Sequence, residues 1–234
     1  MDLNSLFSLS GRVALITGGS RGIGAMFVEG FLAAGVERIY ISARKADQIA
    51  AAVDRFGDRV IGIPGDISTV EGCRALAAEI GAREGKLDIL VNNAGAAWGV
   101  PFEDFPEAGW DKVMDVNVKA PFFLTQALHG LLKAAATADR PAKVINVGSI
   151  DGRALNGWET YSYHASKAGI LHLTKRMAAR LIRDHIVVSA IAPGAFQSDM
   201  NKAARDHGEE VARRIPAGRI GGAEDMAAAA IYLA

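Results

Sequence analysis

The chain has 234 residues, half of them hydrophobic, and its 26 Lys and Arg residues balance 26 Asp and Glu residues. A chain of this length and apolar content can bury one large core, so we expect residues 1–234 to form a single domain. The balanced charge provides no general attraction to nucleic acid or to an anionic membrane surface. We therefore expect neither as a partner, and a small molecule instead.

The cysteine count and the hydropathy pattern bear on the cellular compartment. Cys73 is the only cysteine, which excludes an internal disulfide bond and a cysteine-based zinc site and suits a reducing compartment. No apolar stretch is long enough to span a bilayer, and no basic segment precedes an apolar run at the start of the sequence. We expect a cytoplasmic protein.

The first predicted unit is a strand, a loop and a helix. Residues 13–17 are typical of a buried parallel strand, a glycine-rich turn follows, and a helical pattern extends from residue 23 to about 34. Glycines let a ligand approach the backbone closely, and the free N–H groups at a helix start favour a phosphate. The spacing Gly18-x-x-x-Gly22-x-Gly24 differs from the common G-x-G-x-x-G fingerprint. It predicts a dinucleotide-binding loop, and a glycine-rich connection without a ligand is the alternative.

Strands and helices then alternate along the chain. The apolar patterns predict strands at 36–42, 60–64, 87–91, 143–147 and 186–191. They predict helices at 46–56, from an N-cap at Ser68 to about residue 83, and over 107–136. Pro121 predicts a kink or a break within the last of these helices.

Basic residues occur where an adenosine ribose would bind. Arg44 follows the second predicted strand, and no carboxylate occurs between residues 39 and 45. In nicotinamide-binding folds an acidic residue there binds the ribose 2′-hydroxyl, whereas a basic residue accommodates a 2′-phosphate. Arg21, in the glycine loop, is a second cation for the same phosphate. The alternative is two solvated surface arginines.

Polar residues also follow the later strands. Asp66 and Ile67 follow the third strand, the tetrapeptide Asn-Asn-Ala-Gly at 92–95 follows the fourth, and Ser149 follows the fifth. Open parallel sheets bind ligands beyond the carboxyl ends of their strands, so Ser149 is placed for chemistry. For Asp66 alone, an ordinary turn residue is the alternative.

Two further patterns lie on predicted helices. Tyr163 and Lys167 are four residues apart and share one face of a helix, whereas Tyr161 has an alanine at the corresponding position. Asn117 is a polar residue inside an apolar stretch, so its amide needs buried partners.

These motifs together resemble those of the short-chain dehydrogenase/reductase family over nearly the whole chain. They are T-G-x-x-x-G-x-G at 17–24, N-N-A-G at 92–95, S-x-x-G at 149–152, Y-x-x-x-K at 163–167 and Pro-Gly at 193–194. The resemblance implies a doubly wound parallel α/β sheet of the Rossmann type and NADP rather than NAD as cofactor. It also implies that a last strand is missing from the given sequence, which stops within a helical pattern.

The resemblance implies catalytic roles for Asn117, Ser149, Tyr163 and Lys167. Tyr163 would donate a proton to the carbonyl oxygen, and Ser149 would hydrogen-bond that oxygen. Lys167 would hold the nicotinamide ribose and lower the pKa of the Tyr163 phenol, and Asn117 would anchor a water. The residues implied to bind the cofactor are Gly18, Ser20, Arg21, Gly22, Ile23, Gly24, Arg44, Asp66, Ile67, Asn93, Ala94, Gly95, Tyr163, Lys167, Pro193 and Gly194.

Other residues near these motifs receive lesser roles. We expect Tyr161 to be a wall residue and His164 a bystander, because it would point about a hundred degrees away from Tyr163 on a helix. Trp98 and Trp158 either line an apolar substrate pocket or pack in the core. The histidines have no metal-ligand spacing, so no metal is expected.

Within the family, the closest resemblance is to NADPH-dependent 3-oxoacyl thioester reductases. One alternative is a polyol or sugar-alcohol dehydrogenase of the same family, and another is a dinucleotide-binding protein without turnover. Enzymes of this kind are usually homotetramers. The apolar helices near Trp110 and Tyr163 suit either an interface or burial within the fold.

Overall fold

Six parallel strands form one sheet. The computed structural model describes residues 2–197 and 206–234. The strand order is β3-β2-β1-β4-β5-β6, and all five neighbouring pairs are parallel. The strands are β1 (Val13–Thr17), β2 (Arg38–Ala43), β3 (Val60–Pro64), β4 (Ile89–Asn92), β5 (Ala142–Val147) and β6 (Ile186–Ile191). The order reverses direction between β1 and β4, where sheets of this kind bind their ligands. The doubly wound parallel sheet predicted from the sequence is confirmed.

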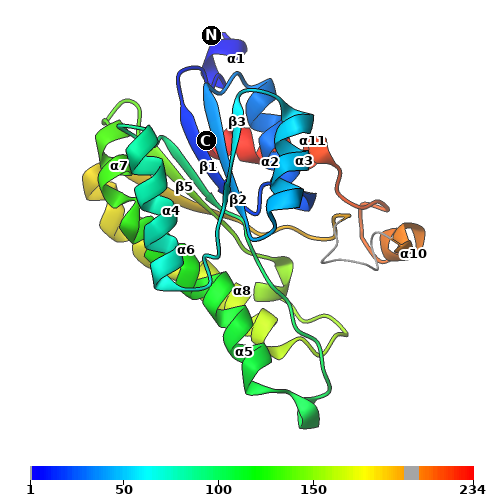
Figure 1. The fold of residues 1–234 in the computed structure, drawn as a ribbon. Coiled ribbons are helices and arrows are strands. Elements are labelled where there is room, and N and C mark those ends of the chain that lie inside the picture. The colour runs from blue at the N-terminus through cyan, green and yellow to red at the C-terminus, as the bar shows by residue number, and fades with distance from the viewer. Residues whose placement is uncertain (1, 198–205) are drawn as a thin grey trace.

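Helices cover both faces of this sheet (Figure 1). One face carries α2 (Gly22–Ala33), α3 (Ala46–Phe56) and α11 (Ala223–Leu233), whose apolar side chains form one core cluster with the strands. The other carries α4 (Val70–Arg83), α6 (Ala120–Ala127), α7 (His129–Ala135) and α8 (Tyr161–Leu181) in a second cluster. The remaining helices are α1 (Leu3–Leu6), α5 (Glu107–Met114) and α10 (Gly208–Arg213).

The strands are buried on both faces, as their sequences predict. Every residue of β1 is buried, and its side chains alternate between the two core clusters. Each fully buried aliphatic side chain stabilises the fold by about 1.5–3 kcal/mol, so the sheet holds its carboxyl edge in a defined position. β6 forms one edge of the sheet in the described part of the chain.

The long helix predicted over 107–136 is divided. A π-helical turn, η2 (Asp115–Lys119), separates α5 from α6, and α7 follows as a separate helix. Pro121 lies in the first turn of α6, where a missing N–H leaves no helical hydrogen bond unmade. The break expected near Pro121 is thus confirmed, and the extra residue of the π turn places Asn117 in a distorted segment.

Several predicted boundaries were wrong by one or two residues, among them the start of the fourth strand, which lies at Ile89 rather than at residue 87. The N-cap of α4 is Thr69, whose hydroxyl accepts the Gly72 N–H (3.0 Å), and not Ser68. Ser68 instead donates its N–H to the Asp66 carboxylate (2.9 Å), which fixes it in the preceding turn. The second strand begins at Arg38 rather than at residue 36, because the Val36 N–H still bonds the Phe31 carbonyl at the end of α2.

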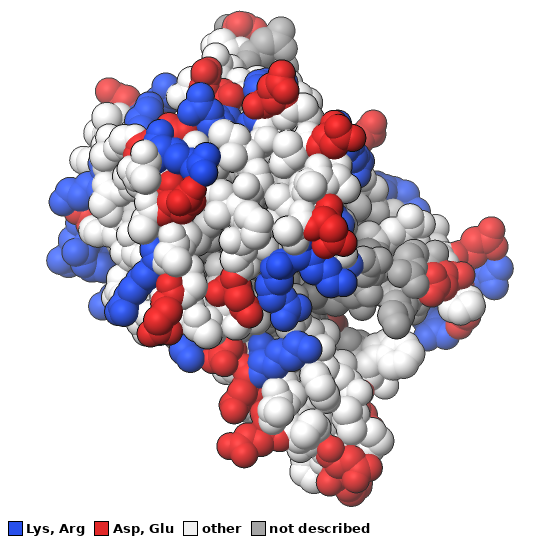
Figure 2. All heavy atoms as spheres, viewed as in Figure 1, with Lys and Arg blue, Asp and Glu red and all other residues white. Residues whose placement is uncertain are grey.

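The surface carries both signs of charge. On the face shown in Figure 2, basic and acidic side chains are interspersed. In the described residues, no helix combines the length and apolar character needed to cross a membrane.

Candidate active site

The turn between β1 and α2 needs its glycines. Gly18 and Gly22 have φ of +67° and +53°, in the left-handed region that side chains disfavour. A Cβ on Gly24 would overlap the carbonyl oxygen of Gly18. These three glycines therefore bring the start of α2 close to the end of β1 and leave its first N–H groups facing a cavity.

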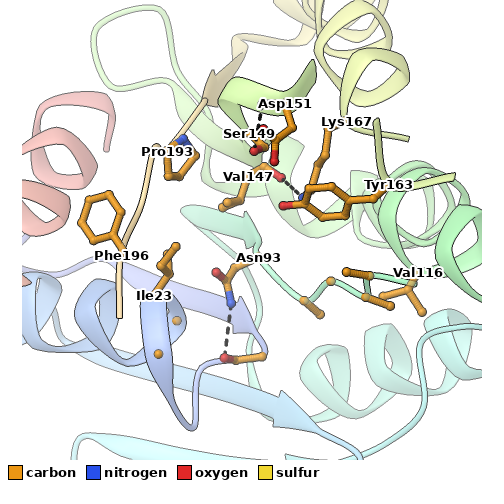
Figure 3. A pocket seen from close by; sticks show the side chains of 18 of the residues that line it. Ile23, Asn93, Val116, Val147, Ser149, Asp151, Tyr163, Lys167, Pro193 and Phe196 are labelled. Carbon is orange, nitrogen blue, oxygen red and sulfur yellow. Dashed lines mark hydrogen bonds between the residues drawn. The ribbon is translucent and has the colours of Figure 1, made fainter. Parts of the chain in front are cut away.

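The Asn-Asn-Ala-Gly segment is bound to this turn. Thr17 Oγ1 accepts the N–H groups of Asn93 and Ala94, both at 3.0 Å. The Asn93 side-chain amide donates to the carbonyls of Thr17 (2.9 Å) and Gly18 (3.2 Å), a contact visible in Figure 3. On the other side, Asn92 Nδ2 donates to Asn146 Oδ1 in β5 (2.9 Å). The segment thus joins the ends of three neighbouring strands.

The far end of the cavity is basic. Arg21 and Arg44 are exposed and line it. Asp66 also lines it, and its pKa is lowered, chiefly by the Ser68 N–H and to a smaller degree by the charge of Arg44. Ser42 Oγ is buried there without a hydrogen-bond partner in the described residues. An open glycine turn, two cations and an unpartnered hydroxyl fit the phosphate and ribose groups of a dinucleotide.

One cavity of about 1180 Å³ connects this end to the predicted catalytic residues. Every cofactor-binding residue predicted from the sequence lines it, and so does Ser149. Asn117 does not belong to its lining. The residues predicted for cofactor binding thus line one cavity that extends from the glycine loop to the end of β5.

Ser149, Tyr163 and Lys167 converge at the inner end of the cavity (Figure 3). Ser149 follows β5 and caps the 3₁₀ turn η3 (Ile150–Gly152), and its Oγ accepts the Asp151 N–H (3.1 Å). Tyr163 and Lys167 lie one turn apart on α8, with Lys167 Nζ 5.5 Å from the centre of the Tyr163 ring. Lys167 Nζ donates to the Val147 carbonyl (2.8 Å), which fixes the ammonium at the end of β5.

Burial is the main cause of the pKa shifts of Tyr163 and Lys167. The pKa of Tyr163 is raised, mainly because the phenol is buried; the Ser149 hydroxyl lowers it and the charge of Asp151 raises it. Burial lowers the pKa of Lys167 to about 8. The sequence analysis expected a lowered pKa for Tyr163, through Lys167, whereas the pKa of Tyr163 is raised. The reason is that both groups leave water, and desolvation disfavours each charged form.

Asn117 is held entirely within the protein. The residue is 2% exposed, and its amide donates to the Ala96 carbonyl and to Ser166 Oγ, both at 2.9 Å. Its oxygen accepts the Ala96 N–H (2.8 Å). Since both amide hydrogens are used, the side chain connects η2, the segment after Asn-Asn-Ala-Gly, and α8.

The aromatic residues and the histidine near Tyr163 differ in whether they line the cavity. Tyr161, expected as a wall residue, lies outside the cavity lining, and its hydroxyl donates to Glu159 (2.6 Å). Trp158 lines the cavity, whereas Trp98 packs against Gly109 of α5. His164 is absent from the lining, and its Nδ1 bonds the Thr160 carbonyl (3.0 Å). In the described residues no cluster of His, Cys, Asp and Glu is arranged to hold a metal ion.

The sequence analysis missed several lining residues. Asp151 lines the cavity two residues after Ser149, and Lys112 lines it from α5. The lining also includes His207, Glu210, Val211, Arg214 and Ile215 from α10 and its flanks. Asp151 was within reach of sequence reasoning, because a carboxylate stood inside the S-x-x-G motif. The residues around α10 carried no motif.

Comparison with known proteins places these features in a family. The family described as short chain dehydrogenase matches residues 12–209. A rhamnolipid-biosynthesis 3-oxoacyl-[acyl-carrier-protein] reductase of Pseudomonas aeruginosa is 44% identical, covering 99% of this chain and 92% of that protein. A 2-dehydro-3-deoxy-D-gluconate 5-dehydrogenase of Dickeya dadantii is 34% identical, covering 100% of this chain and 92% of that protein.

Solved structures agree in fold and in cofactor. The Pseudomonas aeruginosa RhlG/NADP active-site complex has a TM-score of 0.92 and 45% identity, over 97% of this chain and 90% of that one. A gluconate 5-dehydrogenase from Burkholderia cenocepacia in complex with NADP and tartrate has a TM-score of 0.88 and 33% identity, over 100% and 91%. The chain therefore belongs to the short chain dehydrogenase family and is an NADP-dependent oxidoreductase that acts on carbonyl and CH–OH groups.

Proposed function

We propose that Tyr163 is the proton donor in the reduction of a ketone to a secondary alcohol. NADPH supplies the hydride when bound. Ser149 hydrogen-bonds the carbonyl oxygen, and the phenol of Tyr163 gives that oxygen its proton as negative charge develops on it. The observation that carries this proposal is the convergence of Ser149, Tyr163 and Lys167 at the inner end of a cavity that begins at the glycine loop.

Lys167 and Asn117 support the proton donor. The buried ammonium of Lys167 stabilises negative charge on the Tyr163 oxygen after proton transfer. When NADPH is bound, the same Lys167 holds its nicotinamide ribose. Asn117 maintains the π turn against α8, which supports the proposed water site beside Lys167.

Arg21 and Arg44 are proposed to bind the 2′-phosphate of NADPH. This is supported by their exposure at the basic end of the cavity and by the absence of a carboxylate in the β2–α3 connection. Gly18, Gly22 and Gly24 leave room for the cofactor's diphosphate at the start of α2. Asp66 with Ile67 would contact the adenine, and Pro193 with Gly194 the nicotinamide.

Two substrate classes are supported by different observations. A 3-oxoacyl thioester is supported by the relative of that name and by exposed apolar side chains in the cavity lining, Leu155 (91% exposed) and Trp158 (70%). A hydroxylated ketone, the product or substrate of a polyol dehydrogenase, is supported by the relatives named as gluconate dehydrogenases and by the carboxylate of Asp151.

A panel of carbonyl compounds tests the proposed reaction. NADPH consumption is measured with acetoacetyl thioesters, 5-keto-gluconate and simple ketones. We expect turnover with at least one class, since all the proposed catalytic groups are present. Cofactor binding without NADPH consumption across the panel would contradict the proposal and favour the alternative, a dinucleotide-binding protein without turnover.

We further propose a homotetramer in the cytoplasm. Trp110 of α5 is 42% exposed and Phe122 of α6 is 38% exposed, which supports an interface on these helices. Cys73 is the sole cysteine of the sequence and is buried, which fits a reducing compartment. Sedimentation velocity would give a mass near four times that of one chain.

A further inference from the structure

The substrate end of the cavity holds a carboxylate that the proposed proton transfer does not use. Asp151 lies in η3, two residues after Ser149, and lines the cavity together with Tyr163 and Lys167. Figure 3 shows its side chain next to that of Ser149, on the side where the Tyr163 hydroxyl lies. A negative charge therefore stands near the position of the reacting carbonyl.

This carboxylate has no partner among the described residues. Its main-chain N–H donates to Ser149 Oγ (3.1 Å), but no hydrogen bond or ion pair reaches its side-chain oxygens. Other carboxylates with restricted exposure have partners. Asp88 accepts a hydrogen bond from the Val13 N–H, and Asp184 forms ion pairs with Arg180 and Lys133. The carboxylate is half-buried and lines the open cavity, so a hydrogen-bond donor on a bound substrate can take the place of water there.

The position of Asp151 indicates which part of a substrate it meets. Its charge raises the pKa of Tyr163, so the two groups are near each other, yet its oxygens form no hydrogen bond with the Tyr163 or Ser149 hydroxyl. In the proposed reaction, the carbonyl oxygen of the substrate is hydrogen-bonded by Ser149 and Tyr163. The Asp151 carboxylate therefore lies beside the proposed position of the reacting carbonyl and is available to a neighbouring group of the substrate.

We propose that Asp151 determines substrate specificity by accepting a hydrogen bond from a hydroxyl group on a carbon beside the reacting carbonyl. The enzyme then prefers α-hydroxy ketones to ketones without that hydroxyl, and it disfavours substrates with an anionic group at this place. A carboxylate accepts hydrogen bonds but cannot donate them, and its charge repels a second carboxylate. The inference rests on the proposed carbonyl reduction.

The test compares substrates that differ in one group. Values of kcat/KM with NADPH are measured for 3-hydroxy-2-butanone, 2-butanone and pyruvate, with the wild-type chain, Asp151→Asn and Asp151→Ala. We expect the wild type to prefer 3-hydroxy-2-butanone to 2-butanone by about tenfold or more, the effect of one hydrogen bond to a charged group. In both variants we expect the ratio of kcat/KM for 3-hydroxy-2-butanone to that for 2-butanone to fall toward one, and the ratio for pyruvate to that for 2-butanone to rise.

The matched control is a variant of a carboxylate outside the cavity. Asp104→Asn removes an exposed carboxylate outside the cavity lining and should keep the wild-type preference. Variants of Asp151 that turn over ketones with the wild-type preference would overturn this inference and leave the proposed reaction intact. A wild-type chain that consumes no NADPH with any ketone would overturn the proposed reaction, and this inference with it.

Discussion

Lys167 is a cation that the fold holds away from water. Its side chain is 5% exposed, and burial lowers its pKa from 10.5 to about 8. The unfolded chain therefore binds this proton more tightly than the folded protein does. Between about pH 8 and pH 10.5 the unfolded state loses this advantage, so the contribution of Lys167 to stability improves as pH rises. At neutral pH the residue destabilises the fold.

Replacing this cation should therefore stabilise the protein while removing activity. We expect Lys167→Met to raise the free energy of unfolding at pH 7 by about 1–3 kcal/mol, because it ends the cost of burying a charge. The gain should shrink as pH rises above about 8. Urea unfolding at several pH values measures it. Lys175→Met, an exposed position on α8, serves as the control without such an effect, and a less stable Lys167→Met protein at pH 7 would contradict the expectation.

For single residues, the sequence predicted which side chains line the cavity better than it predicted their pKa shifts. Spacing alone separated Tyr163 from Tyr161, and Tyr163 lines the cavity. Tyr161, expected as a wall residue, lies outside that lining. The pKa of Tyr163 was predicted in the wrong direction, because burial depends on the packing of segments far apart in the chain. Asp151 was overlooked because a carboxylate in a turn is ordinary until a cavity surrounds it.

The glycine turn and the β2–α3 connection together form the basic end of the site. Arg21 comes from the first and Arg44 from the second, and β1 pairs with β2, which brings the two segments to the same edge of the sheet. Each charge-assisted hydrogen bond to a phosphate is worth about 1.5–3 kcal/mol, so the pair would favour NADPH over NADH by about a hundredfold or more.

Reversing the charge of this connection should reverse the cofactor preference. In the double variant Ala43→Asp, Arg44→Ala, a carboxylate replaces the cation beside the proposed phosphate position, and we expect a strong shift toward NADH. The measurement is kcat/KM for both cofactors. Arg55→Ala, which removes an arginine of α3 that pairs with Glu29 outside the cavity, is the control. Equal use of the two cofactors by the wild type would show that Arg21 and Arg44 are solvated surface charges.

Helices and strands were predicted well where the apolar residues follow one clear spacing. They were predicted less well where tertiary packing determines the boundary. The strands were found because most of their residues are apolar, as in β1, where all five residues are buried. The residues 107–136 read as one helix, since a π turn changes the backbone by one residue without changing the apolar pattern. The N-cap of α4 was placed one residue early because Ser68 and Thr69 both suit a cap, and the Asp66 carboxylate takes the Ser68 N–H.

The strand order of the sheet explains why residues from distant segments of the chain line one cavity. The strand order places the ends of β1, β4 and β5 side by side, so the glycine turn, the Asn-Asn-Ala-Gly segment and Ser149 face one cavity. The order of these motifs in the sequence, which resembles that of the family, predicted this arrangement. The residues around α10 complete the cavity from a distant part of the chain, and no local pattern pointed to them.

The most direct test of the proposed reaction removes one oxygen atom. Tyr163→Phe keeps the volume of the side chain and the cavity but lacks the proton donor, so kcat should fall by about a hundredfold or more while NADPH binding persists. Tyr161→Phe, on the same turn of α8 but outside the cavity lining, should keep nearly wild-type kcat. If Tyr163→Phe retained most of the wild-type kcat and Tyr161→Phe did not, Tyr163 would not be the proton donor.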